Sequence, residues 1–213
     1  MTQLEKVYQY LTDNYKENEP IFLSDISIPG IKDVSVRQQM KKLTESGKIK
    51  HFDTGIYFIP RKTIFKSGST LSVDEVIRKK YLVDGEVQCG YLSGLMFANK
   101  LGLTTQVPMV YEVCSNKATT DYRDMQIGKF RIILRRPYVE VTSQNVNELQ
   151  FLDLMKEVVD VSEIEGMKLT ESLVNYLKAK NIAFDSLRPY LSYYPDKIYK
   201  NMFEVGLLNG VAT

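Results

Sequence analysis

The sequence of 213 residues predicts an α+β protein whose three parts cover residues 1–62, 63–165 and 166–213. Apolar residues with helical spacing and segments typical of strands both occur in the first two parts, whereas the third part is helical. In the second part, the order helix, helix, strands, helix favours a small, mainly antiparallel sheet over a parallel doubly wound one. The third part is expected to be a helical extension that packs on the second part or continues it.

The first part contains a short amphipathic helix with a basic face. Val36, Met40 and Leu43 recur at i, i+4 and i+7, so they share one side of a helix. Ser35 followed by Gln38 is typical of a capping box at the helix start, and Gly47 is typical of the residue that ends a helix. The other side carries side chains that can hydrogen-bond to base edges in a major groove: Arg37, Gln38, Lys41 and Lys42.

A hairpin follows this helix at once. Residues 48–52 and 56–59 alternate like strands, and the triplet Asp53-Thr54-Gly55 between them favours a turn. Together with an amphipathic helix at residues 4–11 and a short helix at residues 23–26, this order predicts an N-terminal winged helix-turn-helix. The candidate DNA-binding residues are Ser35, Arg37, Gln38, Lys41 and Lys42 from the helix and Lys48, Lys50 and Thr54 from the hairpin.

Basic charge gathers in this part of the chain. Residues 34–62 hold seven Lys or Arg against two acids, a local balance of +5, whereas the whole chain carries +2. This concentration favours DNA binding. Two alternatives stay open, namely a solvated helix beside a hairpin and a winged helix that binds proteins. Residues 61–70 are expected to connect the domains, with Lys62 and Lys66 as further candidates for phosphate contacts.

The composition is that of an ordinary soluble protein. Hydrophobic residues make up 44% and charged residues 25% of the chain, and no apolar run is long enough for a membrane span. The N-terminus lacks the basic and apolar segments of a signal peptide. The only cysteines, Cys89 and Cys114, are expected to be buried thiols in a reducing compartment. We therefore expect a cytoplasmic protein.

The sequence offers no catalytic constellation. It contains no Gly-x-Gly, so dinucleotide-binding and kinase glycine loops are excluded. Its only histidine, His51, lies in the predicted hairpin, which removes histidine-based triads and histidine zinc sites. No Asp-x-Lys or Glu-x-Lys occurs, and Glu112 is followed by Val and Cys, which argues against one class of metal-dependent nuclease. We expect no enzyme, no metal and no cofactor, and a binding function instead.

In the second part, Ser72 is expected to cap a helix that ends near Tyr81 or Leu82, and a second helix is expected to begin at Gly90 and Tyr91. Thr142 is expected to cap a helix that continues to about residue 155. The expected strands are residues 110–114, 124–127 and 130–134, the last two joined by a tight turn at Gly128 and Lys129. After Leu169 three further helices follow, and residues 209–213 are expected to fray.

Arginines on the last expected strand offer a second DNA contact. Arg131 and Arg135 share strand parity and so project on one face, whereas Arg136 points to the other. Such a contact would lengthen the footprint on DNA and steepen its salt dependence. The alternative is pairing with nearby acids such as Asp121 and Asp124.

Four segments of the chain carry a family resemblance. They are residues 90–95 (GYLSGL), residues 98–108 (ANKLGLTTQVP), the hairpin from 127–129 (IGK) to 133–136 (ILRR), and residues 149–152 (LQFL). Together they resemble the AbiEi-type antitoxins of bacterial abortive-infection systems, which are called type IV toxin–antitoxin systems. The resemblance runs from about Leu4 to Glu157, and the run ending in Thr-Thr-Gln-Val-Pro is its most specific element.

The resemblance implies a function in phage defence. Members of this family repress their own operon by binding inverted repeats in promoter DNA, and they neutralise a nucleotidyltransferase-like toxin without requiring a stable complex with it. Because such an operator is an inverted repeat, two protomers are expected to bind it. The chain can be a monomer in solution and still assemble in this way on the DNA. Six polar residues are candidates for the function of the second domain: Tyr91, Ser93, Asn99, Thr104, Thr105 and Gln106. The alternative, with at least equal weight, is that they are buried polar groups and caps that specify its fold.

Two other functions stay open. One is a winged-helix transcription regulator whose C-terminal domain senses a ligand or a partner and has no toxin. The other is a protein-interaction module whose winged helix does not contact DNA.

Overall fold

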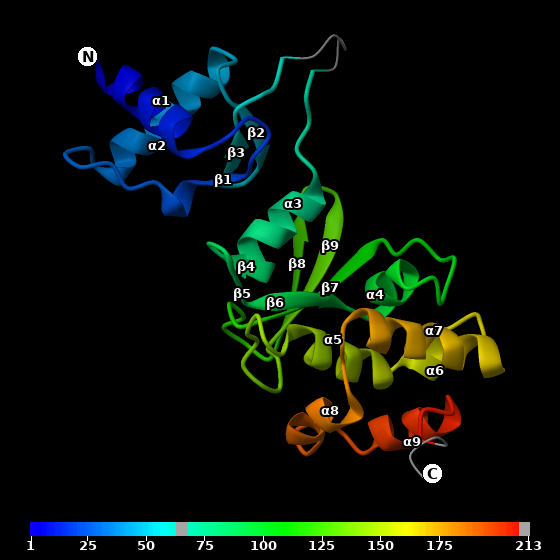
Figure 1. Ribbon diagram of the computed structural model, residues 1–213. Coiled ribbons are helices and arrows are strands. Elements are labelled where there is room, and N and C mark those ends of the chain that lie inside the picture. The colour runs from blue at the N-terminus through cyan, green and yellow to red at the C-terminus, as the bar shows by residue number, and fades with distance from the viewer. Residues whose placement is uncertain (63–67, 209–213) are drawn as a thin grey trace. The chain divides into compact units, whose positions relative to one another are not determined.

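The computed structural model describes residues 1–62 and 68–208; Lys66 and residues 209–213 lie outside the described residues (Figure 1). The chain divides into two compact units, Met1–Lys79 and Lys80–Thr213. Helices alternate with small sheets in which most strand pairs are antiparallel, so the predicted α+β class is confirmed. None of the helices in the described ranges is both long and apolar enough to cross a membrane.

The first unit has a three-stranded antiparallel sheet with the strand order β1-β3-β2. Its elements are α1 (Gln3–Asn14), β1 (Ile21–Phe22), the 3-10 turn η1 (Leu23–Asp25), α2 (Asp33–Glu45), β2 (Lys50–Asp53), β3 (Ile56–Phe58) and α3 (Val73–Ile77). Ser72 caps α3 by accepting a hydrogen bond from the Asp74 amide, as the sequence predicts. A π-helical turn, η2 (Arg78–Leu82), continues α3 to the predicted end.

Helix α2 begins earlier than the sequence predicts. Its N-cap is Lys32, which provides no side-chain cap, and Ser35 lies inside the helix, so the predicted Ser35 capping box is wrong. The carboxylate of Asp33 lies in the first turn, where its negative charge interacts favourably with the unpaired amide groups at the helix start. This interaction stabilises a helix that begins at Asp33. The predicted end is confirmed, because Gly47 has φ +73° and the Lys48 amide bonds to the Leu43 carbonyl.

The core of the first unit fixes which side of α2 faces outward. Val7 and Leu11 from α1 and Met40 and Leu43 from α2 are fully buried, and Ile49 joins them from just before β2. Full burial of each such side chain contributes roughly 1.5–3 kcal/mol to folding. With this apolar stripe held inward, the polar side of α2 is left to solvent.

The second unit is built on a four-stranded mixed sheet. Its strands are β6 (Gly90–Ser93), β7 (Val110–Ser115), β8 (Tyr122–Ile127) and β9 (Phe130–Arg135), in the order β6-β7-β9-β8. Strands β7 and β9 are parallel, and the other two pairs are antiparallel. The expected strands and the two-residue turn between β8 and β9 are therefore confirmed. A short hairpin precedes the sheet, formed by β4 (Val83–Asp84) and β5 (Val87–Gln88).

The expected helix start at Gly90 and Tyr91 is wrong, because these residues form strand β6. A side chain at Gly90 would collide with the carbonyl groups of Tyr81 and Cys114, so glycine permits this close backbone approach. Helix α4 (Gly94–Lys100) begins only after the strand. Gly94 has φ +59°, and a Cβ there would collide with the Glu112 carboxylate.

The expected cap at Thr142 is also wrong, because α5 (Val146–Met155) begins four residues later with Asn145 as its N-cap. The Asn145 side chain accepts a hydrogen bond from the Thr142 amide and donates one to the Glu140 carbonyl. These bonds close a turn ahead of the helix, in which the Thr142 hydroxyl only accepts from the Gln144 amide.

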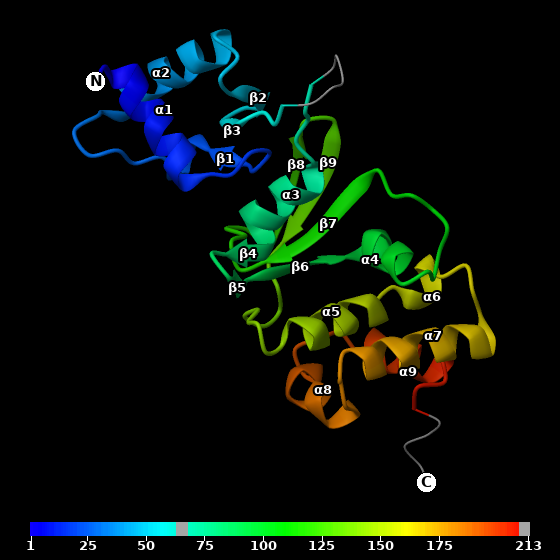
Figure 2. The same ribbon diagram turned by 45° about the horizontal axis from the view of Figure 1, so that its top comes forward.

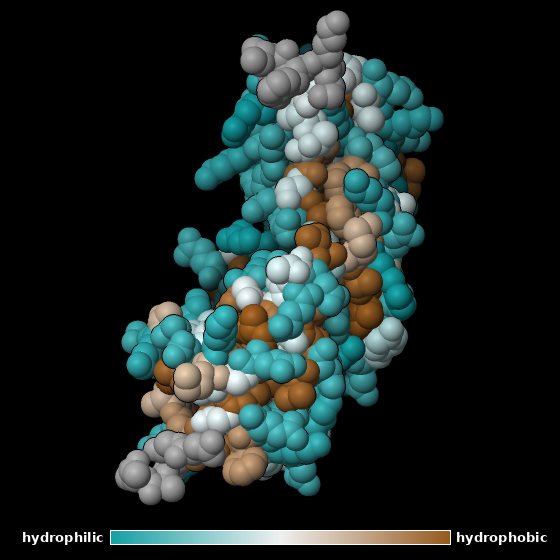
Figure 3. Space-filling model, turned by 90° about the vertical axis from the view of Figure 1, so that its right-hand side faces the viewer, coloured by the Kyte–Doolittle hydropathy of each residue, from teal (hydrophilic) through white to brown (hydrophobic). Residues whose placement is uncertain are grey.

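Helix α5 is the centre of the second unit, and each of its residues is buried or half-buried. It lies between the sheet and the C-terminal helices (Figure 2), and it shares one hydrophobic core with them. Those helices are α6 (Val158–Val161), α7 (Gly166–Ala179), α8 (Phe184–Leu191) and α9 (Lys197–Glu204). The space-filling view shows apolar residues that reach the surface among hydrophilic ones on one face (Figure 3).

Candidate nucleic-acid interface

Helix α2 carries an exposed polar face. Arg37, Gln38, Lys41 and Lys42 are all exposed, and Ser35 is half-buried. They lie opposite the buried side chains of Val36, Met40 and Leu43 on the same helix. Four of the five helix residues predicted to bind DNA therefore share an open surface, and the fifth borders it.

The charges on this face are only weakly neutralised. Lys41 Nζ lies 4.0 Å from Glu45 Oε1, and the two side chains are 80% and 63% exposed. An ion pair with that exposure contributes at most about 1 kcal/mol, so little is lost when Lys41 turns to another anion.

A cavity of about 380 Å³ lies between η1 and the start of α2. Arg37 lines it together with Ser24, Ser27 and Asp33, while Val36 and Ile26 supply part of its apolar wall. The cavity places a guanidinium and two hydroxyls beside the N-terminal turn of α2. Groups of this kind donate to phosphates and base edges, whereas the carboxylate of Asp33 opposes an anion there.

The hairpin residues have different surroundings. Thr54 is exposed at the β2–β3 turn, and its amide donates to Asp53 Oδ1 at 2.7 Å. Lys48 is exposed, with its Nζ 4.7 Å from the centroid of the Tyr8 ring. Lys50 is half-buried and donates to the Ser69 carbonyl at 3.2 Å, so its ammonium group is held by the segment that follows the hairpin.

On the sheet of the second unit, the two candidate arginines are engaged by acids. Arg131 forms a two-pronged contact with Asp124, with N–O distances of 2.6 to 3.1 Å, and hydrogen bonding to Arg131 lowers the pKa of Asp124. Arg135 lies 3.1 Å from Glu112. Arg136 lies 3.5 Å from Asp121. The arginines are therefore paired with nearby acids, which is the expected alternative to a second DNA contact.

The motif residues 104–106 form a tightly bonded loop. The amide and hydroxyl of Thr105 donate to Glu163 Oε2, and the Gln106 side chain donates to the other oxygen of the same carboxylate. These bonds lower the pKa of Glu163 to about 2. Asn99 donates to the Thr104 and Gln106 carbonyls. The polar groups of the motif thus specify the loop conformation.

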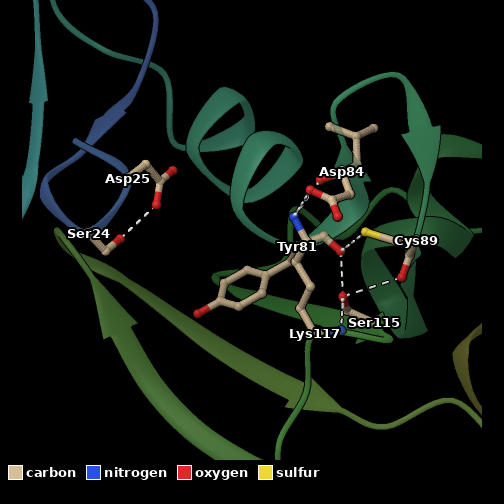
Figure 4. A network of polar contacts seen from close by, with 8 residues as sticks. Ser24, Asp25, Tyr81, Asp84, Cys89, Ser115 and Lys117 are labelled. Carbon is tan, nitrogen blue, oxygen red and sulfur yellow. Dashed lines mark hydrogen bonds and ion pairs between the residues drawn. The ribbon is translucent and has the colours of Figure 1, made fainter. Parts of the chain in front are cut away.

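A second polar network joins η2, β4 and Cys89 to the end of β7 and the residues that follow it (Figure 4). Ser115 Oγ donates to the Tyr81 carbonyl at 2.5 Å, and Cys89 Sγ lies 3.6 Å from the same oxygen. Lys117 donates to the Val83 carbonyl at 2.8 Å and lies 3.5 Å from Asp84. Burial raises the pKa of the Cys89 thiol, which disfavours the reactive thiolate.

Sequence reasoning missed a buried charged cluster centred on Asp153. Tyr91 Oη and Cys114 Sγ each donate to Asp153 Oδ2 at 3.0 Å, and Lys156 Nζ lies 2.7 Å from Oδ1. Burial and the Asp153 carboxylate raise the pKa values of Tyr91 and Cys114 well above their ordinary range. Burial opposes the charge on Lys156, yet Asp153 outweighs it and raises the pKa of Lys156.

Comparisons with known proteins give no relative: neither a protein-family model nor a curated protein matches this chain. The resemblance to AbiEi-type antitoxins therefore rests on the four segments named above.

Proposed function

We propose that this chain is a winged helix-turn-helix protein that binds duplex promoter DNA through α2 and the β2–β3 hairpin and represses transcription. The observation that carries the proposal is the face of α2, where Arg37, Gln38, Lys41 and Lys42 are exposed above a fully packed apolar stripe. A short helix of this kind, held from behind, fits a major groove. The order of α1, η1, α2 and the hairpin supports the same proposal.

The residues divide into two roles under this proposal. Arg37 and Gln38 lie nearer the start of α2 and read base edges, since their side chains can bond to two acceptors or donors of one base. Lys41, Lys42 and Lys48 contact phosphates, and Thr54 approaches the backbone from the hairpin turn. Lys50 has a smaller part, because its ammonium group already donates to Ser69.

The family resemblance adds a role to DNA binding. We propose that the chain acts in the bacterial cytoplasm as the antitoxin of an abortive-infection system and opposes a nucleotidyltransferase-like toxin without a stable complex. Co-expression with a neighbouring nucleotidyltransferase-like reading frame tests this role. Rescue of growth by this chain supports it, and continued toxicity at matched expression contradicts it.

A second candidate function is a transcription regulator whose second unit senses a small ligand and which has no toxin. The observation that favours it is a cavity of about 380 Å³ beside the buried Asp153 cluster. Charged groups held in a cleft are more common at functional sites than elsewhere.

The test of DNA binding is a fluorescence anisotropy titration of the purified chain with its own promoter fragment and with a scrambled fragment, over a series of salt concentrations. Tighter binding to the promoter, with a steep fall in affinity as salt rises, is the expected result. Equal affinity for both fragments at every salt concentration contradicts sequence-dependent binding. Affinity without any salt dependence contradicts phosphate contacts by the lysines.

A further inference from the structure

The second unit contains a cavity of about 380 Å³ at the end of β7 and β9, beside the C-terminal end of α5. Its size falls in the range of small-molecule sites. Its lining residues come from four segments of the chain and are mostly charged or aromatic: Cys114, Asp121, Arg135, Arg136, Pro137, Tyr138, Asp153 and Lys156.

The floor of this cavity is a buried ion pair, in which Asp153 Oδ1 lies 2.7 Å from Lys156 Nζ and makes no hydrogen bond with the described residues. Asp153 is 2% exposed and Lys156 is 16% exposed, and the carboxylate also accepts from Tyr91 and Cys114. Taking both charges out of water costs several kcal/mol per ion, and an apolar pair of similar volume would pack at least as well. The chain nevertheless places a cation at the base of an open cavity, which the core alone does not require.

Two arginines complete a cationic wall. Arg135 is one-third exposed and lies between Glu112, at 3.1 Å, and Glu157, at 3.9 Å. Arg136 is 54% exposed, and its partner Asp121 is 92% exposed at 3.5 Å. That outer pair is weak, so Asp121 can move away from Arg136 Nη1, which then becomes available to an anion. Arg136 Nη2 meanwhile donates to the Thr119 carbonyl at 3.0 Å, which holds the guanidinium in place. A guanidinium matches the oxygens of a phosphate in a two-pronged contact.

An aromatic ring stands beside these cations. Tyr138 is 48% exposed. Its centroid lies 5.1 Å from Lys156 Nζ and 4.8 Å from the centroid of the Tyr194 ring. Contacts with Lys156 and Tyr194 hold the ring in place while nearly half of its residue surface stays open. A flat base can stack on such a ring regardless of its identity.

We propose that this cavity binds a mononucleotide, with its phosphate on Arg136, Arg135 and Lys156 and its base against Tyr138. Three cations line the cavity against the carboxylates of Asp121 and Asp153, and a phosphate can take the place of Asp121, whose ion pair is exposed. The aromatic ring favours a nucleotide over a bare phosphorylated sugar. The site lies wholly within the second unit, so the proposal does not rest on DNA binding by α2.

The test is isothermal titration calorimetry of the full chain with the four nucleoside monophosphates, and with ribose 5-phosphate and inorganic phosphate as ligands that lack the base. Arg136→Gln removes an exposed cation of the site and is expected to weaken nucleotide binding roughly tenfold or more. Arg188→Gln is the matched control, because Arg188 is also an exposed arginine, on α8, with an exposed aspartate partner. Tyr138→Leu is expected to weaken nucleotides but to leave ribose 5-phosphate unchanged.

The outcomes separate clearly. Nucleotide binding that falls with Arg136→Gln and not with Arg188→Gln supports the site. Absence of binding by all four nucleotides overturns the proposal, and so does equal loss in both arginine variants. Binding of ribose 5-phosphate or inorganic phosphate as tight as that of the nucleotides overturns the assignment to nucleotides. The promoter titration is run separately, so its failure leaves this result unaffected.

Discussion

Asp153 on α5 and Lys156, the residue that ends this helix, form an ion pair of 2.7 Å in which the carboxylate is 2% exposed. The pair lies beside the hydrophobic core of the second unit, where Leu152 and Met155 are fully buried. Its net contribution to stability is small, because desolvation of both charges offsets most of their attraction. Each partner nevertheless depends on the other, since a buried charge without its partner is not solvated by water.

Lys156→Met is therefore expected to destabilise the chain by about 3–5 kcal/mol, because it leaves the buried Asp153 carboxylate without its cation. Urea denaturation measures this loss as a fall in the free energy of unfolding. Lys178→Met, at an exposed position of α7, is the control and is expected to change stability little. The double variant Asp153→Asn/Lys156→Met keeps an acceptor for Tyr91 and removes both charges, so it should recover much of the loss. If the double variant loses as much stability as the single variants Asp153→Asn and Lys156→Met together, the two residues are not coupled.

Glu163 gives a prediction of pH dependence. Hydrogen bonds from Thr105 and Gln106 lower its pKa from the ordinary 4.5 to about 2. The folded-state pKa lies below the unfolded one, so the stability that these bonds contribute is present above the unfolded pKa and is lost as pH falls through about 2. An NMR titration of the Thr105 amide is expected to show its main transition near pH 2. Glu163→Gln should abolish that transition, and a transition at the ordinary value of a glutamate would contradict the clamped loop.

The sequence predicts those elements whose signals are local. Strands β7, β8 and β9 lie close to their expected bounds, with the expected turn at Gly128 between β8 and β9, and the end of α2 follows from Gly47. Strand β6 has no such signal, because all four of its residues are buried and do not alternate. Its strand form depends on pairing with β7, about twenty residues further along the chain, and on the absence of a side chain at Gly90.

The Asp153 cluster could not be predicted for the same reason. From the sequence, a charged residue within a helical segment is expected on the solvent-exposed face of the helix. Its burial depends on tertiary packing, which local patterns do not show. The partners of Asp153 are Tyr91 on β6 and Cys114 on β7, about sixty and forty residues earlier. The start of α2 shows a smaller version of this limit, since the capping pattern at Ser35 predicts a later start than the observed one at Asp33.

Arg37→Ala and Lys41→Ala separate base reading from phosphate contact. Loss of a base-reading side chain is expected to cost about 1–3 kcal/mol on the promoter and little on scrambled DNA. Loss of a phosphate contact is expected to weaken both fragments alike and to lower the salt slope by about 1. Anisotropy titrations over a salt series measure both effects, with Lys178→Ala in the second unit as the charge-matched control. Equal losses on both fragments for Arg37→Ala would refute its base-reading role, and an unchanged slope for Lys41→Ala would refute its phosphate contact.

Asp33→Asn is expected to move DNA affinity and stability in opposite directions. Asp33 is exposed in the first turn of α2 and lines the same cavity as Arg37, so its charge repels a phosphate that approaches this end of the helix. Removing the charge should raise promoter affinity, most strongly at low salt, where screening is weakest. It should also lower stability by about 0.3–1 kcal/mol, because a carboxylate favours the start of a helix. Asp185→Asn, in the first turn of α8, is the control that should share the second effect and lack the first. Unchanged or weaker promoter binding by Asp33→Asn at low salt would place the DNA away from the N-terminal end of α2.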